Sequence, residues 1–149
     1  MFGVTLDDFR SRTCATAACW RREQFTDGGV NVRLGQGWKA FMLEEHCANK
    51  HGCVKRGVGE YNDAIAVHEQ DSNITFRVIE AKSSGSLADS LAQLQKGADY
   101  LDQAIGNVRA EFTAEVHTRP RPATSVRVPK HIEIRSRRRR VQVEVMSSG

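Results

Sequence analysis

Hydrophobic residues recur along this chain with two different periods, which predict a mixture of helices and strands. The clearest helical period, with spacings of four and three, is that of Leu87, Leu91, Leu94, Ala98, Leu101 and Ile105. This stripe predicts an amphipathic helix from Leu87 to about Ile105 that ends at Gly106 and Asn107.

Two short runs rich in β-branched and aromatic residues precede that helix. Residues 64–67 (AIAV) and 74–79 (ITFRVI) are separated by a polar turn from His68 to Asn73. This arrangement is typical of a β-hairpin, so we expect two antiparallel strands here.

The first third of the chain is less regular. A helix is predicted from Thr5, a suitable N-cap, to somewhere between Trp20 and Glu23. Residues 30–34 alternate as in a short strand, although a loop is an open alternative. A second helix is predicted from Gly37 to about Cys47.

Alternating residues return in the last third. Val108 to Thr118 predicts a strand, and residues 132–134 and 141–145 predict a hairpin with an arginine-rich tip. We therefore expect one α/β domain over residues 1–149, with a central mixed sheet of about four to six strands and helices on its faces.

Charged residues cluster at the ends of the two central strands. Asp63 opens the first run, and Glu80, Ala81 and Lys82 close the second. Because side chains alternate along a strand, Glu80 and Lys82 share a face. Carboxylates are the ligands that Mg²⁺ and Mn²⁺ prefer, so Asp63 and Glu80 predict a divalent-metal site with Lys82 beside it.

Asp63 followed by Glu80-Ala81-Lys82 resembles the PD-(D/E)xK nuclease superfamily, which includes restriction endonucleases, junction resolvases and bacterial toxin domains. The resemblance covers residues from about 35 to 107 and implies a restriction-endonuclease-like core. It also implies a glutamate on the preceding helix. By its helical angle this is Glu45, with Glu44 in reserve, and Gln93 on the following helix would complete the catalytic set.

The charge distribution favours an anionic partner. Residues 119–149 carry nine Lys or Arg and two Glu, whereas the rest of the chain carries 13 basic and 16 acidic residues. Nucleic-acid phosphates are therefore the expected partner of this basic C-terminal hairpin. The candidate contacts are Lys55, Arg56, Arg135, Arg137, Arg138, Arg139 and Arg140.

The function expected from these features is phosphodiester hydrolysis with Mg²⁺ or Mn²⁺, with DNA favoured over RNA and tRNA a possible substrate. The resemblance suggests a toxin of interbacterial competition that a larger carrier delivers into the target-cell cytoplasm, with a cognate immunity protein as partner. Three alternatives remain open: a dimeric repair nuclease such as a junction resolvase, a non-catalytic nucleic-acid-binding module, and a cysteine-stapled secreted domain.

The cysteine spacing bears on zinc binding and disulfides, and the hydropathy bears on membrane spans and secretory signals. Cys14, Cys19, Cys47 and Cys53 have spacings of C-x4-C and C-x5-C, unlike the C-x2-C of zinc ribbons, so zinc is not expected. Free thiols are favoured over disulfides. No apolar run reaches the roughly 18 residues that a membrane span needs, and Met1 to Arg10 does not form a secretory signal.

Overall fold

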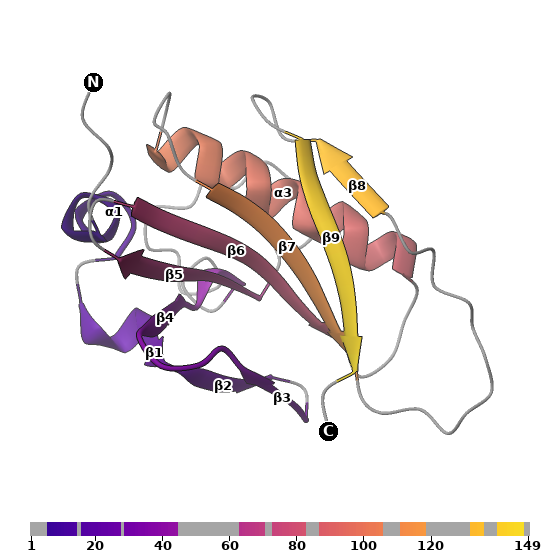
Figure 1. Cartoon of the computed structure of the whole chain (residues 1–149), viewed down its shortest axis with the longest axis horizontal. Coiled ribbons are helices and arrows are strands. Elements are labelled where there is room, and N and C mark those ends of the chain that lie inside the picture. The colour runs from indigo at the N-terminus through magenta and orange to yellow at the C-terminus, as the bar shows by residue number, and fades with distance from the viewer. Residues whose placement is uncertain are drawn as a thin grey trace.

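The computed structural model describes residues 6–14, 16–27, 29–44, 63–70, 73–82, 87–105, 111–118, 132–135 and 140–147. These residues build an α/β fold around a mixed sheet of seven strands (Figure 1). In spatial order the strands are β1 (Trp20–Arg22), β4 (Trp38–Phe41), β5 (Ala64–Gln70), β6 (Asn73–Lys82), β7 (Glu111–Thr118), β9 (Arg140–Ser147) and β8 (Ile132–Arg135).

The centre of the sheet agrees with the sequence pattern. Strands β5 and β6 are antiparallel, with Ala64 opposite Ile79, which confirms the predicted hairpin. Helix α3 (Leu87–Ile105) has the predicted bounds and carries the chain from β6 to β7, which lies parallel to β6. A helix usually connects two parallel neighbouring strands, because the chain must return along the length of the first strand before it begins the second.

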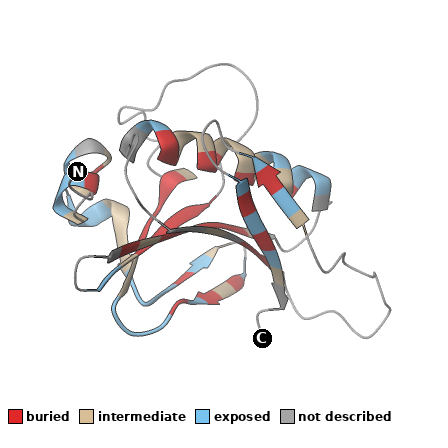
Figure 2. Cartoon of the chain, turned by 45° about the horizontal axis from the view of Figure 1, so that its top comes forward, coloured by how far each residue is buried: buried red, intermediate tan, exposed pale blue. Residues whose placement is uncertain are grey.

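Two hydrophobic layers hold the sheet (Figure 2). On one face, Phe76 and Val78 of β6 pack with Leu94 of α3 and with Phe9 of α1 (Leu6–Arg12). On the other face, Ile79 packs against the two-stranded ribbon of β2 (Gln24–Asp27) and β3 (Val30–Arg33). Both faces of the central strands are therefore buried.

The ribbon β2–β3 changes the expected architecture. Strand β3 confirms the strand interpretation of residues 30–34, but β2 was not predicted. The expectation of helices on both faces is wrong for the described residues, since a β-ribbon covers the second face. The sheet also has seven strands instead of four to six.

The predicted helix from Gly37 to Cys47 is wrong over residues 38–41, which form strand β4, whereas helical backbone begins at Leu43 and residues 45–47 lie outside the described residues. Gly35 and Gly37 adopt φ values of 104° and 85°, a region that favours glycine, and they turn the chain into the strand. Ala40 and Phe41 then face opposite layers and are both fully buried. A strand buried on both faces has no alternation, so its apolar run imitates a helical stripe.

The first helix is shorter than predicted. It ends at Arg12 instead of continuing to Trp20, and Ala17–Cys19 forms a single 3₁₀ turn before β1. The side chain of Thr13 donates a hydrogen bond to the carbonyl of Phe9 at 2.7 Å. Trp20 packs against the core from strand β1 and not from a helix.

The C-terminal hairpin has the predicted topology. Strands β8 and β9 are antiparallel, with Ile134 opposite Val141, and β9 lies parallel to β7. The predicted strand from Val108 is confirmed as β7, which begins at Glu111. The arginine-rich tip, residues 136–139, lies outside the described residues.

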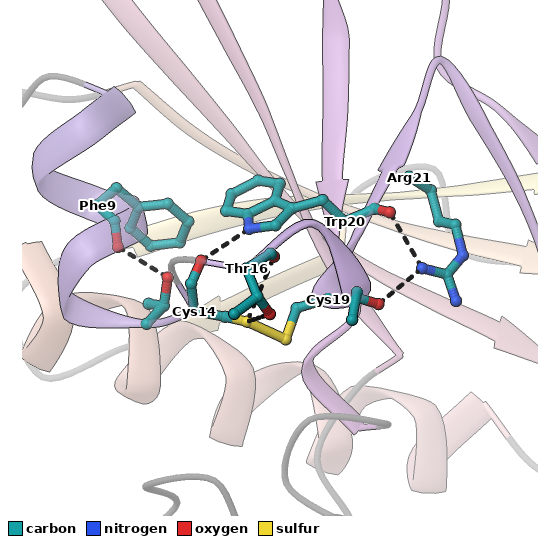
Figure 3. The surroundings of a disulfide bond; sticks show 8 residues. Phe9, Cys14, Thr16, Cys19, Trp20 and Arg21 are labelled. Atoms are coloured by element: carbon teal, nitrogen blue, oxygen red, sulfur yellow. Dashed lines mark hydrogen bonds between the residues drawn. A yellow bond between two sulfur atoms is a disulfide. The ribbon is translucent and has the colours of Figure 1, made fainter.

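A disulfide joins Cys14 and Cys19 close to the rings of Phe9 and Trp20 (Figure 3). The indole Nε1 of Trp20 donates to the carbonyl of Cys14 at 2.9 Å, and the Trp20 ring meets Phe9 edge to face. The expectation of free thiols is therefore wrong for this pair. Cys47 and Cys53 lie outside the described residues.

Replacement of both Cys14 and Cys19 by serine is expected to lower the free energy of unfolding by about 2 kcal/mol, because a short covalent loop no longer restricts the unfolded chain. Urea unfolding of the oxidised protein and the double variant measures this difference. The exposed Ala18 of the same loop provides a control as Ala18→Ser. Equal stability of the double variant and the wild type would contradict the expectation.

None of the described helices is both long enough and apolar enough to cross a membrane.

Candidate metal site

The hairpin β5–β6 brings two acidic residues together at one end. The ladder pairs Ala64 with Ile79, so the next position places Asp63 beside Glu80. Asp63 is 4% exposed and Glu80 is 2% exposed. Because an isolated buried carboxylate is strongly disfavoured, this pair requires protons, hydrogen bonds or a cation.

Backbone groups fix the position of Asp63. The N–H of Ala81 donates to Asp63 Oδ2 at 2.6 Å. The N–H of Glu44 donates to the carbonyl oxygen of Asp63 at 3.4 Å. Asp63 is thus held between β6 and the short helical turn that begins at Leu43, just after β4.

Two further carboxylates complete the cluster. Asp27 comes from the end of β2, and Glu44 follows β4. Ligand atoms of Asp27, Glu44 and Asp63 all lie within 4.8 Å of one another. Glu80 lies within hydrogen-bonding reach of Asp63. We call these residues, Asp27, Glu44, Asp63 and Glu80, the acidic cluster.

Burial and neighbouring acids raise the pKa of Asp63 far above the ordinary value of 3.8. Removal from water is the largest cause, followed by hydrogen bonds with the carboxylates of Glu80, Asp27 and Glu44 and by the charge of Glu80. Asp63 therefore holds its proton at neutral pH unless a cation replaces it.

The donor set of the acidic cluster suits a hard divalent cation. Mg²⁺, Mn²⁺ and Ca²⁺ prefer carboxylate oxygens, whereas structural zinc sites are built mainly from thiolates and imidazoles. Two of the carboxylates are buried and two are half-buried, so the cluster has a protected side and a side that solvent reaches.

The structure places some of the predicted metal ligands and not others. The structure brings Asp63 and Glu80 together, as predicted. Glu45 lies outside the described residues, and its helical angle loses its basis because residues 38–41 form a strand. The reserve candidate, Glu44, lies in the acidic cluster.

Other predicted catalytic residues are placed only in part. Lys82 ends β6 two positions after Glu80, and its side chain lies outside the described part of the chain. Gln93 is half-buried on α3. Its role in orienting the water stays a prediction.

Asp27 is not among the metal ligands that the sequence predicts. Asp27 and Gly28 form an Asp-Gly pair between two alternating segments, which is a strong hairpin signal. That signal predicts the β2–β3 ribbon, but it does not predict that the ribbon folds toward Asp63.

The predicted nucleic-acid contacts can be placed at two positions. Arg135 and Arg140 face each other at the base of the β8–β9 hairpin, and both are exposed. Arg140 forms an exposed ion pair with Glu133 at 3.7 Å. The remaining candidates, Lys55, Arg56, Arg137, Arg138 and Arg139, lie outside the described residues.

A second polar group lies on the sheet face covered by the ribbon. His117 is 3% exposed, and its Nε2 lies 3.2 Å from Glu115 Oε2. Arg77 pairs with Glu115 at 3.4 Å and stacks over the Trp38 ring. These contacts join three strands and satisfy the charges internally, so we treat the group as structural.

Comparison with models of known families, with curated proteins and with solved structures finds no significant match for this chain. A functional assignment therefore depends on the chemistry of the acidic cluster and of the basic hairpin.

Proposed function

We propose that the chain is a divalent-metal-dependent nuclease that hydrolyses phosphodiester bonds, with DNA favoured over RNA. The observation that carries the proposal is the acidic cluster, in which Asp63 and Glu80 lie together and Lys82 follows Glu80 by two strand positions. Acids and a lysine in this order at strand ends suit the handling of a cation and a phosphate.

Each residue has a distinct role in this proposal. Asp63 and Glu80 hold Mg²⁺ or Mn²⁺, and Glu44 and Asp27 complete its ligands. When bound, the cation would lower the pKa of a water and neutralise charge that develops on the phosphate. Lys82 meets a phosphate oxygen or orients the water, and Gln93 assists in that orientation.

The order of elements supports a restriction-endonuclease-like core. Helix α3 follows the strand that bears Glu80 and Lys82, and it leads to a parallel strand. This strand, turn and helix sequence is what the resemblance to PD-(D/E)xK nucleases implies. We therefore propose a restriction-endonuclease-like core within the observed α/β fold.

The basic hairpin supplies the substrate contacts. Arg135 and Arg140 are exposed at its base, and guanidinium groups bind phosphates in a bidentate manner. Such contacts bind nucleic acids without reading sequence. A toxin domain delivered into a target-cell cytoplasm, with an acidic immunity protein as partner, is the biological setting that the resemblance suggests.

Incubation with plasmid DNA, genomic DNA and total RNA tests this function. We expect cleavage with Mg²⁺ or Mn²⁺, loss of cleavage with EDTA, and recovery when the cation is restored, because the acidic cluster needs a counter-charge. Gel analysis of the products measures cleavage and identifies the substrate. Binding of nucleic acid without cleavage in any divalent cation would contradict the nuclease and favour a non-catalytic binding module.

A further inference from the structure

The side-chain amide of Gln95 joins helix α3 to the basic hairpin. The backbone N–H of Arg135 donates to Gln95 Oε1 at 3.0 Å, and Gln95 Nε2 donates to the backbone carbonyl of Arg135. The two residues are 40 positions apart in sequence. One primary amide therefore satisfies both backbone groups of Arg135, as a neighbouring strand would do.

The position of Gln95 on α3 explains this contact. Leu94, Ala98 and Leu101 are fully buried beneath the helix, and Gln95 lies about 100° around the axis from Leu94. It is therefore on the flank of α3 and not on its buried stripe. The hydrogen bonds show that this flank faces strand β8.

Strand β8 needs such support. It has four residues and lies at the end of the sheet, where β9 is its one partner among the described strands. Ile134 is buried against the core, whereas Arg135 is exposed and is the last described residue before the tip. Gln95 closes the open edge of β8 at this point, where the strand would otherwise expose backbone groups.

We propose that Gln95 is a positioning residue that holds the base of the basic hairpin so that Arg135 and Arg140 bind nucleic-acid phosphates. This inference rests on the proposed nucleic-acid binding of the hairpin. Arg135 and Arg140 are directly paired across the ladder, so fixing the Arg135 backbone fixes both side-chain origins. Arginines held in place lose less conformational entropy when they bind a phosphate chain.

Gln95→Ala tests the proposal by fluorescence anisotropy with a labelled DNA duplex in EDTA, where cleavage cannot interfere. We expect affinity to fall about five- to tenfold, since freed arginines must be ordered again on binding. Gln103→Ala is the matched control, because Gln103 is exposed on the same helix. The Gln103→Ala variant should bind the duplex with an affinity within about twofold of the wild type, because most surface substitutions change the stability of a protein very little.

The salt dependence separates positioning from contact. Arg135→Ala should weaken binding and lower the slope of log Kd against log salt by about one, because one phosphate contact is lost. Gln95→Ala should weaken binding with the slope retained. Hydrogen exchange at the Arg135 amide should accelerate in Gln95→Ala and stay unchanged in Gln103→Ala.

Three results would be decisive against parts of this account. Wild-type affinity in Gln95→Ala would overturn the role of Gln95. Wild-type affinity in both Arg135→Ala and Arg140→Ala would overturn the proposal together with its premise that the hairpin binds phosphate. Weakened binding of Gln95→Ala in a protein that cuts no nucleic acid would support the positioning role and overturn only the nuclease.

Discussion

Replacement of Glu80 by glutamine is expected to abolish metal-dependent cleavage, with a rate loss greater than about 100-fold. Loss of a residue that only hydrogen-bonds to a metal ligand already lowers metal affinity or activity by about 10- to 100-fold. Glu80 is proposed as a direct ligand, so its loss should have a larger effect. The amide has nearly the same volume, so the 2% exposed site can remain packed while its negative charge disappears. Initial rates of plasmid cleavage in Mg²⁺ measure the loss.

Glu144→Gln is the matched control for this prediction. Glu144 undergoes the same chemical change but is exposed on β9, away from the acidic cluster. We expect wild-type rates from it and an unchanged fold in both variants, as checked by circular dichroism. Wild-type cleavage by Glu80→Gln would remove Glu80 from the catalytic site.

Replacement of Asp63 by asparagine is expected to stabilise the metal-free protein above pH 4 while abolishing its response to Mn²⁺. Burial and the neighbouring carboxylates raise the pKa of Asp63, so the fold favours its neutral form. The stabilising contribution of neutral Asp63 to the free energy of unfolding is complete below 3.8, the pKa of Asp63 in the unfolded chain. It is lost as pH rises toward the higher pKa of Asp63 in the folded protein. The loss reaches at most about 1.4 kcal/mol per pH unit for one group.

Asparagine removes this dependence because its amide stays neutral. Its oxygen can still accept the hydrogen bond from the Ala81 N–H, and its NH₂ group can donate to the neighbouring carboxylates. Thermal unfolding between pH 4 and pH 8, with and without Mn²⁺, measures both effects. The wild type should gain more from Mn²⁺ as pH rises, since the cation displaces a proton.

A flat pH profile of the wild type would contradict this prediction, as would equal Mn²⁺ stabilisation of both proteins. Asp7→Asn is a suitable control, because Asp7 is an exposed acid in the first turn of α1. It should leave both the pH dependence and the response to Mn²⁺ unchanged.

The sequence predicts the parts of the fold that local pattern determines. Helix α3 has an unbroken stripe, and the β5–β6 hairpin has two β-branched runs around a polar turn, so both were predicted correctly. Strand β4 could not be identified in this way. Its residues Ala40 and Phe41 are buried on opposite faces, which removes the alternation that distinguishes a strand.

The residues of the candidate site also fall into those that local pairing predicts and those that it does not. Asp63 and Glu80 lie together because they belong to one hairpin, so their proximity follows from local pairing. Asp27 and Glu44 join them through contacts between distant segments, which no sequence spacing encodes. The choice of Glu45 over Glu44 depended on a helical angle counted from Trp38, which lies in strand β4, and Glu45 itself lies outside the described residues.

Crystals soaked in Mn²⁺ near pH 8 would show whether the acidic cluster binds a divalent cation, through anomalous diffraction at the manganese edge. We expect a peak within about 2.0 to 2.4 Å of carboxylate oxygens from Asp63 and Glu80, with Glu44 or Asp27 in the same shell. No anomalous peak between these carboxylates at saturating Mn²⁺, or a peak only elsewhere on the chain, would contradict the proposed metal site.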